Sequence, residues 1–362
     1  MKEHEEIFYR ILDTGIKAKA SDIHLTNKLV PTVRVDGVLR KLGGFDDNTA
    51  ESLASFVDIL LNEKQKINYD RDKEADSSLA YGDVRFRVHI YKQNKSDALV
   101  LRIIPTEIPG FKEMNLPEVL KSFTKLKNGL VLITGITGSG KSTTLAAMID
   151  EINETQAKNI ITIEDPVEFI HQHKKSIVNQ REIGSDVLSF DRAVRAAMRE
   201  DPDILLVGEM RDLETIKNAI TMAETGHLVF GTLHTKSVPE TVDRIIDVFP
   251  PEQQDQIRIQ LANSIEGIVC QNLLPNKNGG RVPSLEIMII NDAIKSIIRE
   301  NQSANAIIDS IILSPGAQTK IQSLAKLVVA RNIDLNTAKD QIKEEEYESL
   351  QRTIVSMQNT TK

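Results

Sequence analysis

Residues 129–152 read GLVLITGITGSGKSTTLAAMIDEI. An apolar run typical of a buried strand comes first, a glycine-rich turn follows, and a helical pattern ends the stretch. The turn and its flanks, residues 135–142, fit the pattern G-x-x-x-x-G-K-[ST]. Glycines in this pattern let backbone N–H groups curl around an anion, and the N-terminus of the following helix adds partial positive charge. The stretch therefore predicts a phosphate-binding loop between a strand and a helix.

The side chains of this loop suit a nucleoside triphosphate. Lys141 can place its ammonium against the β and γ phosphates, and the hydroxyl of Ser142 can bind magnesium. We therefore expect ATP and Mg²⁺ as cofactors. The residues expected to bind the nucleotide are Gly135, Thr137, Gly138, Ser139, Gly140, Lys141, Ser142 and Thr143.

Further apolar runs alternate with helical patterns after the loop. The runs are NIITIED (159–165), DILLVGE (203–209) and HLVFGTLH (227–234), and they are nearly continuous, as strands buried on both faces should be. Helices are predicted between them, as in a succession of βαβ units. We predict a doubly wound, mostly parallel sheet of the α/β class, and a helical chain after Gln260.

Polar side chains come just after each of these runs. Ligands of open α/β sheets bind beyond the carboxyl ends of the strands, so we expect these side chains to surround the phosphates. Glu209 is predicted to hold the magnesium shell or its water, and His234 to contact or sense the nucleotide. Glu164 and Glu168 are both candidates for the acid that polarises the attacking water. The pattern does not choose between them.

His227 lies at the opposite end of the strand that His234 follows. His227 and His234 are seven positions apart, which at about 3.3 Å per residue separates them by roughly 23 Å, so the two histidines cannot touch the same phosphate. From its position alone, His227 is predicted to cap the preceding helix or to contact a neighbouring subunit.

The bulk composition limits the classes of function. The formal net charge is −7, from 45 Lys and Arg against 52 Asp and Glu, so there is no global basic surface and nucleic acid is not expected as a partner. The single cysteine, Cys270, can form no internal disulfide and is expected to be buried. No apolar run is long enough to cross a bilayer, so we expect a cytoplasmic protein that reaches a membrane only through a partner.

The first part of the chain has a different pattern. Residues 30–42 alternate apolar and polar side chains around an Asp36-Gly37 turn, which predicts a hairpin. Two more strands and one helix follow, so residues 1–105 are predicted to form a small α+β domain. Pro105, Pro109 and Gly110 then indicate a linker over residues 106–115. Residues 116–362 are predicted to form the larger domain with its C-terminal helical region.

These segments together resemble the type IV pilus retraction ATPases, the PilT family, within the secretion ATPase superfamily. ITIEDPVEF (161–169) resembles the family's acidic box, REDPDILLVGEMRD (199–212) its Walker B segment and TGHLVFGTLHT (225–235) its His box, all in the family's order. ASDIHLTNKLVPTVRVDGVLR (20–40) resembles its PAS-like N-terminal domain. The resemblance covers nearly the whole chain and implies a RecA-like P-loop ATPase domain preceded by a smaller PAS-like α+β domain.

The resemblance also assigns residues that the pattern alone does not. It implies that His227 and His234 form a pair at the nucleotide, that Glu209 has the Walker B role and that Glu164 and Glu168 are the candidate catalytic acids. The family places arginines of the N-terminal domain near the γ-phosphate, which matches Arg87 and Arg102. Such arginines stabilise the charge that develops in the transition state.

Two features of the sequence favour retraction over extension within this family. Extension relatives have a longer N-terminal region and usually a tetracysteine zinc module, whereas this chain has one cysteine. AIKSIIRE, residues 293–300, looks like the late AIRNLIRE signature of retraction relatives, and differs at Lys295, Ser296 and Ile297.

The resulting hypothesis is a homohexameric, Mg-dependent ATPase whose hydrolysis rotates the two domains and powers pilus retraction. Its expected partner is an inner-membrane pilus platform, so the protein should be peripheral at the inner face of the cytoplasmic membrane. A RecA-like nucleic-acid or secretion translocase is one alternative. A nucleotide-binding regulator of the pilus machine that does not cycle is another.

Overall fold

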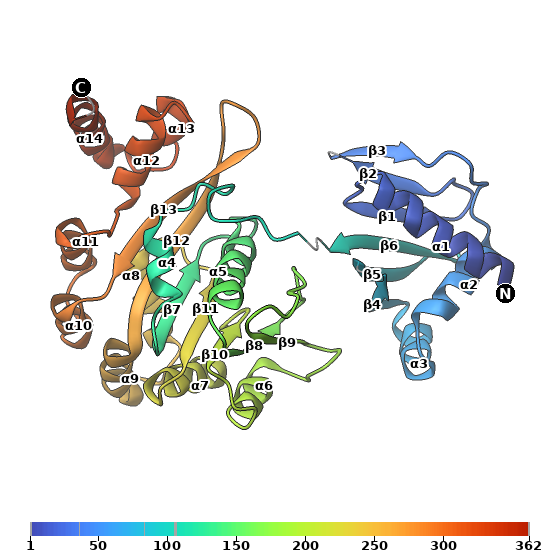
Figure 1. Ribbon diagram of the computed structural model, residues 1–362, viewed down its shortest axis with the longest axis horizontal. Coiled ribbons are helices and arrows are strands. Elements are labelled where there is room, and N and C mark those ends of the chain that lie inside the picture. The colour runs from blue at the N-terminus through green and yellow to red at the C-terminus, as the bar shows by residue number, and fades with distance from the viewer. Residues whose placement is uncertain (1, 36, 83, 105–106, 361–362) are drawn as a thin grey trace. The chain divides into compact units, whose positions relative to one another are not determined.

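The computed structural model describes residues 2–35, 37–82, 84–104 and 107–360 (Figure 1). The chain divides into two compact units between Glu107 and Ile108, and Glu168–Ile170 group with the first unit. Each unit is described by itself. The turn residue Asp36 and the predicted domain boundary at Pro105 lie outside the described residues.

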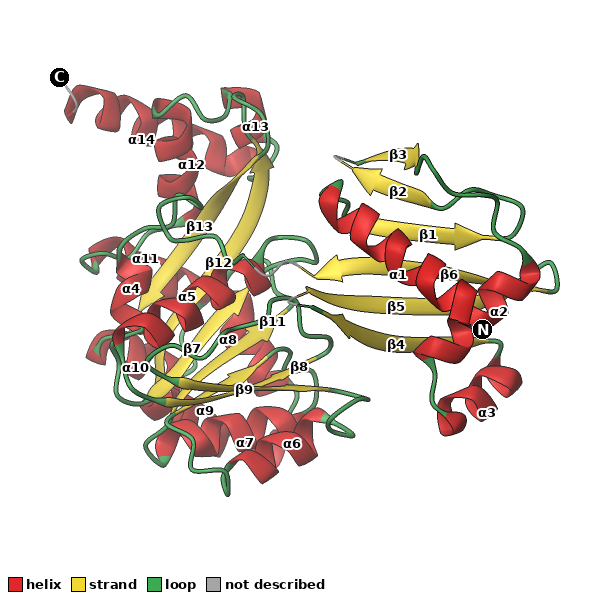
Figure 2. Ribbon diagram, turned by 45° about the vertical axis from the view of Figure 1, so that its right-hand side comes forward, coloured by secondary structure: helices red, strands yellow, loops and turns green. Residues whose placement is uncertain are grey.

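The described residues of the first unit form a six-stranded sheet in the order β3-β2-β1-β6-β5-β4, and all of its strand pairs are antiparallel (Figure 2). The hairpin predicted over residues 30–42 is β2 with β3. The strands are β1 (Asp22–Thr26), β2 (Thr32–Val35), β3 (Val38–Lys41), β4 (Glu74–Tyr81), β5 (Val84–Gln93) and β6 (Ser96–Ile104).

One face of this sheet is apolar, because side chains alternate along its strands. In β5, Phe86, Val88 and Ile90 are fully buried, whereas Arg87 and His89 between them are only half-buried. The buried side chains join those of three helices in one core, and each such burial stabilises the fold by about 1.5–3 kcal/mol. The helices of this unit are α1 (Lys2–Lys17), α2 (Ala50–Leu60) and α3 (Glu63–Asp72).

The described residues of the second unit form a seven-stranded sheet in the order β13-β12-β7-β11-β10-β8-β9 (Figure 1). Every neighbouring pair is parallel except β12 with β13. This confirms the predicted mostly parallel α/β sheet. The strands are β7 (Gly129–Thr134), β8 (Asn159–Glu164), β9 (Ile177–Glu182), β10 (Ile204–Val207), β11 (Leu228–Leu233), β12 (Ile265–Pro275) and β13 (Arg281–Ile289).

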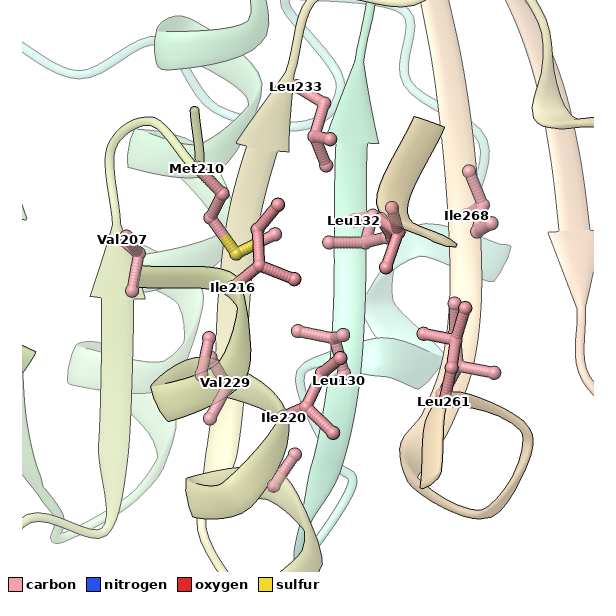
Figure 3. Packing of buried hydrophobic residues seen from close by; sticks show 14 of the residues in the cluster. Leu130, Leu132, Val207, Met210, Ile216, Ile220, Val229, Leu233, Leu261 and Ile268 are labelled. Carbon is pink, nitrogen blue, oxygen red and sulfur yellow. The ribbon is translucent and has the colours of Figure 1, made fainter. Parts of the chain in front are cut away.

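Helices cover both faces of this sheet, as a doubly wound fold requires. Alternate residues of β7 enter opposite cores: Leu130 and Leu132 pack on one side and Val131 and Ile133 on the other. Figure 3 shows Leu130 and Leu132 together with side chains of β10, β11 and β12 in the first of these cores. The helices between the strands are α4 (Val119–Phe123), α5 (Lys141–Thr155), α6 (Phe190–Ala197), α7 (Leu213–Glu224), α8 (Val238–Asp247) and α9 (Pro251–Ser264).

The prediction of a helical chain after Gln260 is wrong for β12 and β13. The apolar part of β12 is buried on both faces of the sheet, so it has no two-residue alternation that marks it as a strand. Beyond β13 the chain is helical: the first two of its helices pack in a core of the sheet, and the last three pack around Leu274 of β12 and Val282 of β13. These five helices are α10 (Asp292–Arg299), α11 (Ala304–Leu313), α12 (Lys320–Val329), α13 (Leu335–Lys339) and α14 (Tyr347–Thr360).

The structure also tests the expectations for the linker, the cysteine and membrane-spanning segments. Phe111, inside the predicted linker, is 5% exposed and packs in the core of the second unit with Ile108 and Met114, so this part of the linker belongs to that unit's packing. Cys270 is buried as expected, and burial raises the pKa of its thiol to about 12. Among the described residues, no helix has the length and apolarity needed to cross a bilayer.

Candidate active site

The predicted phosphate loop connects β7 to α5. Gly135, Gly138 and Gly140 have φ values of 144°, 77° and 86°, which L side chains rarely adopt. A Cβ at Gly135 would also lie 2.2 Å from the backbone oxygen of Gln271. The glycines are therefore required both by the curl of the loop and by its contact with β12.

Lys141 begins α5 and turns back over the loop. Its Nζ donates hydrogen bonds to the backbone oxygens of Gly135 at 2.8 Å and Ile136 at 3.1 Å. Burial lowers the pKa of Lys141, while the negative charge of Glu209 opposes that shift. The ammonium thus lies at the loop and within the electrostatic reach of Glu209 at the end of β10.

The remaining loop residues differ in exposure. Thr137, Gly138 and Ser142 are exposed, and Thr143 is half-buried in the first turn of α5. Ser139 is buried, and its hydroxyl oxygen has no hydrogen-bond partner among the described residues. The Ser142 hydroxyl and the Glu209 carboxylate are oxygen donors of the kind that Mg²⁺ prefers, so the residues present fit this ion.

Glu209 and His234 follow neighbouring strands, β10 and β11, and the structure brings them together. Nε2 of His234 lies 3.1 Å from Oε1 of Glu209, and Arg211 contacts the same carboxylate oxygen. The Glu209 side chain is 17% exposed, against 39% for His234. A carboxylate held by an imidazole and a guanidinium is therefore presented at the carboxyl edge of the sheet, one strand away from β7, which carries the phosphate loop.

The electrostatics of His234 favour a neutral ring. Burial lowers the pKa of His234 most, the positive charges of Lys141 and Arg211 lower it further, and Glu209 opposes them. A neutral imidazole carries one N–H donor and one acceptor nitrogen. His234 can thus donate to an oxygen of Glu209 or of a phosphate without adding a second cation beside Lys141.

The two candidate catalytic acids differ in their surroundings. Glu164 ends β8, and its Oε1 accepts hydrogen bonds from Thr162 at 2.6 Å and Gln180 at 3.3 Å. A Cβ at Gly208 would lie 3.1 Å from Cα of Glu164, so Glu164 is close to the end of β10. Glu168 is exposed in the segment after β8 and groups with the first unit. The second unit by itself brings only the first of these two acids to the strand ends.

Arg87 and Arg102 belong to the first unit. They are paired in register across β5 and β6 and lie on the face of the sheet opposite its apolar core. Nε of Arg102 donates to Oδ1 of Asp22 at 3.0 Å, and burial of that carboxylate is outweighed by Ser21 and Arg102, which lower the pKa of Asp22. The structure thus places the two arginines side by side, and their position at a γ-phosphate stays a prediction.

His227 is not brought to the phosphate loop of its own chain. It precedes β11 at the amino edge of the sheet, and its Nδ1 lies 3.0 Å from the backbone oxygen of Met222 near the end of α7. The strand of six residues between the two histidines separates them, as their spacing requires. Within one chain His227 caps a helix, so its predicted nucleotide contact does not occur there.

Two polar residues next to the loop were missed by the sequence analysis. Gln271 of β12 donates from Nε2 to the backbone oxygen of Ser139 at 2.7 Å, and its Oε1 accepts from Thr144 at 2.8 Å. Arg281 of β13 reaches the backbone oxygen of Gly138 at 3.4 Å. Gln271 follows the apolar residues of β12 in the same way as Glu209 follows those of β10. Because ligands bind beyond the carboxyl ends of the strands, recognising this run as a strand would have made Gln271 a candidate.

These features define a class of protein. A glycine-rich phosphate loop at the carboxyl edge of a mostly parallel sheet, with a lysine in the loop and an acid at the end of a nearby strand, is the site of a P-loop ATPase of RecA-like build. Comparison with protein families gives the particular family. The chain belongs to the Type II/IV secretion system proteins, whose family model matches residues 3–340.

Individual relatives agree with this assignment. The chain is 48% identical over 295 residues to the type IV pilus retraction ATPase PilT of Pseudomonas aeruginosa, covering 81% of this chain and 86% of that protein. It is 47% identical to a twitching motility protein of Neisseria gonorrhoeae, covering 82% and 80%. A crystal structure of the pilus retraction motor PilT with bound ADP superposes with a TM-score of 0.87 at 45% identity, covering 94% of this chain and 98% of that one.

Proposed function

We propose that this chain is a Mg-dependent ATPase motor that works as a homohexamer and powers retraction of a type IV pilus. The observation that carries the proposal is the meeting of Lys141, Glu209 and His234 at one edge of the sheet, in a chain 48% identical to a pilus retraction ATPase. The solved relative that contains ADP supports the same nucleotide class for this loop.

The proposed roles follow from the geometry. Backbone N–H groups of the loop bind the phosphates, and Lys141 leaves the carbonyls of Gly135 and Ile136 to pair with the β and γ oxygens. Mg²⁺, held by Ser142 and by Glu209 or its water, would neutralise charge on the phosphates. Glu164 or Glu168 orients the attacking water, and His234 donates to the developing charge.

The proposed roles of Arg87, Arg102 and His227 depend on a neighbouring subunit. Arg87 and Arg102 stabilise the γ-phosphate during transfer, as the family resemblance implies. His227, which caps α7 in its own chain, contacts the neighbouring subunit. A homohexamer supplies the neighbours for these contacts, and cycles of hydrolysis rotate the N-terminal domain, predicted over residues 1–105, relative to the ATPase domain, predicted over residues 116–362.

The proposed place of action is the cytoplasmic face of the inner membrane. The described chain has no membrane-spanning helix, so its link to the membrane is an inner-membrane pilus platform protein. The partner takes up the motion of the ring, and pilus subunits leave the fibre at its base.

The test is deletion of the gene and complementation with wild-type protein or with Lys141→Ala. Lys141→Ala should lose ATP hydrolysis by about a thousandfold or more, because the ammonium that pairs with the phosphates is gone. Cells that carry the variant should accumulate unretracted surface pili. Loss of surface pili would indicate an extension motor, and wild-type turnover in the purified variant would refute the site.

A further inference from the structure

Gln271 lies at the level where the phosphate loop begins, on the neighbouring strand. The last register partners of β12 and β7 are Cys270 and Thr134, so Gln271 and Gly135 both follow directly at the carboxyl edge. The contact is close, because a Cβ at Gly135 would lie 2.2 Å from the backbone oxygen of Gln271. The phosphate loop therefore packs directly against the backbone of β12.

The side-chain amide of Gln271 connects the loop to the helix that follows it. It is 3% exposed. Its nitrogen donates to the carbonyl of Ser139, and its oxygen accepts from the hydroxyl of Thr144, one turn into α5. Because the carbonyl oxygen of Ser139 can only accept a hydrogen bond, the loop requires the Nε2 donor of the Gln271 amide.

From these contacts we infer that Gln271 is a positioning residue for nucleotide binding. The C=O and N–H of a trans peptide point to opposite sides. A Ser139 carbonyl fixed toward Gln271 therefore turns the N–H of Gly140 away from β12, where a phosphate seated on the loop can accept it. Gln271 holds the loop in its binding conformation before the nucleotide arrives, and the apparent affinity depends on the fraction of loops so arranged.

The adjacent residue provides a matched comparison. Asn272 has the same amide, on the same strand, but its Nδ2 donates to Oε1 of Gln341 at 2.8 Å, near the last helices. Within the described part of the chain, the Asn272 side chain makes no hydrogen bond to the phosphate loop, whereas Gln271 makes one to the loop and one to its helix. Removing the Gln271 amide costs two buried hydrogen bonds, and removing the Asn272 amide costs two partly buried ones. Only the amide of Gln271 orients a donor for phosphate.

The experiment compares Gln271→Met with Asn272→Leu, which each replace an amide by an apolar side chain of similar shape. The dissociation constant for MgADP is measured calorimetrically with the full chain, and the Tm is measured without nucleotide. Gln271→Met should weaken MgADP binding about ten- to a hundredfold, because the Ser139 carbonyl loses its buried partner. Asn272→Leu should change the Tm and leave MgADP binding within about twofold of wild type.

A second variant covers the case in which Gln271→Met does not fold. Gln271→Glu keeps the acceptor for Thr144 and can donate to Ser139 only when its carboxyl is protonated, so its affinity for MgADP should fall as pH rises. The inference is overturned if either Gln271 variant binds MgADP as wild type does, or if Asn272→Leu loses as much affinity. This inference rests on the proposed nucleotide site, and the two fail differently: wild-type protein that binds no MgADP would refute the site itself.

Discussion

Glu209 receives two nitrogen donors at one carboxylate oxygen, from His234 and from Arg211. This pairing holds the acid at the strand end. The side chain can therefore keep its orientation when a phosphate takes its place beside Lys141, whose pKa already reflects the charge of Glu209.

Glu209→Gln should bind ATP and hydrolyse it slowly. The amide keeps the shape of the side chain but loses the charge that holds the magnesium shell or its water, so kcat should fall about a hundredfold or more. Steady-state turnover and an ATP dissociation constant measure the two effects separately. Glu164→Gln and Glu168→Gln, measured alongside, identify the acid that orients water as the one whose loss lowers kcat without weakening binding. Normal turnover in all three variants would remove the acids from the mechanism.

The two histidines that flank β11 offer a direct contrast. His234→Ala should lower kcat about a hundredfold with little change in Tm, because it removes a donor from the strand end. His227→Ala should lower the Tm, because in its own chain this side chain caps α7. Turnover and thermal unfolding of both variants measure this. A larger loss of kcat in His227→Ala than in His234→Ala would assign the functional imidazole to the subunit boundary.

At the scale of elements, the segment between β8 and β9 contains a half-buried titratable group whose Nδ1 is shielded from solvent. Burial lowers the pKa of His171 to about 4, and the charge of Asp150 opposes the shift only in part. An unfolded histidine titrates near about 6.5, so below that pH the unfolded chain binds a proton that the folded chain does not. The free energy of unfolding should therefore decrease as the pH is lowered from about 6.5 to about 4, by up to about 1.4 kcal/mol per pH unit.

The measurement is urea unfolding at about pH 7 and about pH 5. His171→Gln should reduce the difference between the two pH values, because the titrating group is gone. His173→Gln is the control, since this side chain is exposed and accepts a hydrogen bond from the backbone of Val178. It should lower the stability at both pH values and keep the difference. An unchanged difference in His171→Gln would mean that another group titrates on unfolding.

At the scale of the whole molecule, the net charge of −7 separates a pilus motor from a nucleic-acid translocase. ATPase activity should rise with assembly of the ring and should not respond to DNA, because no excess of basic side chains releases counterions from a phosphate backbone. Turnover with and without single- and double-stranded DNA at low salt tests this, with sedimentation in MgATP as the measure of assembly. Strong stimulation that disappears as salt rises would favour the translocase, and absence of any turnover would favour a nucleotide-binding regulator.

The sequence by itself determined the features that depend on local order. The pattern of residues 135–142 gave the phosphate loop, because its glycines and lysine act within a few residues of one another. Apolar runs with polar ends gave β8, β10 and β11, and with them Glu164, Glu209 and His234. The parallel order of the sheet followed from the alternation of strands and helices.

Only the tertiary structure decided which residues from distant segments meet. β12 carries no alternation because both of its faces are buried, so its strand character and the role of Gln271 depend on β7 lying beside it. The distance of His227 from the loop follows from strand geometry and a cap on the preceding helix was one of two expectations, but only the fold brings its Nδ1 to the backbone oxygen of Met222. The pairing of Asp22 with Arg102 is likewise a matter of register between strands 80 residues apart in the chain, which no local pattern encodes.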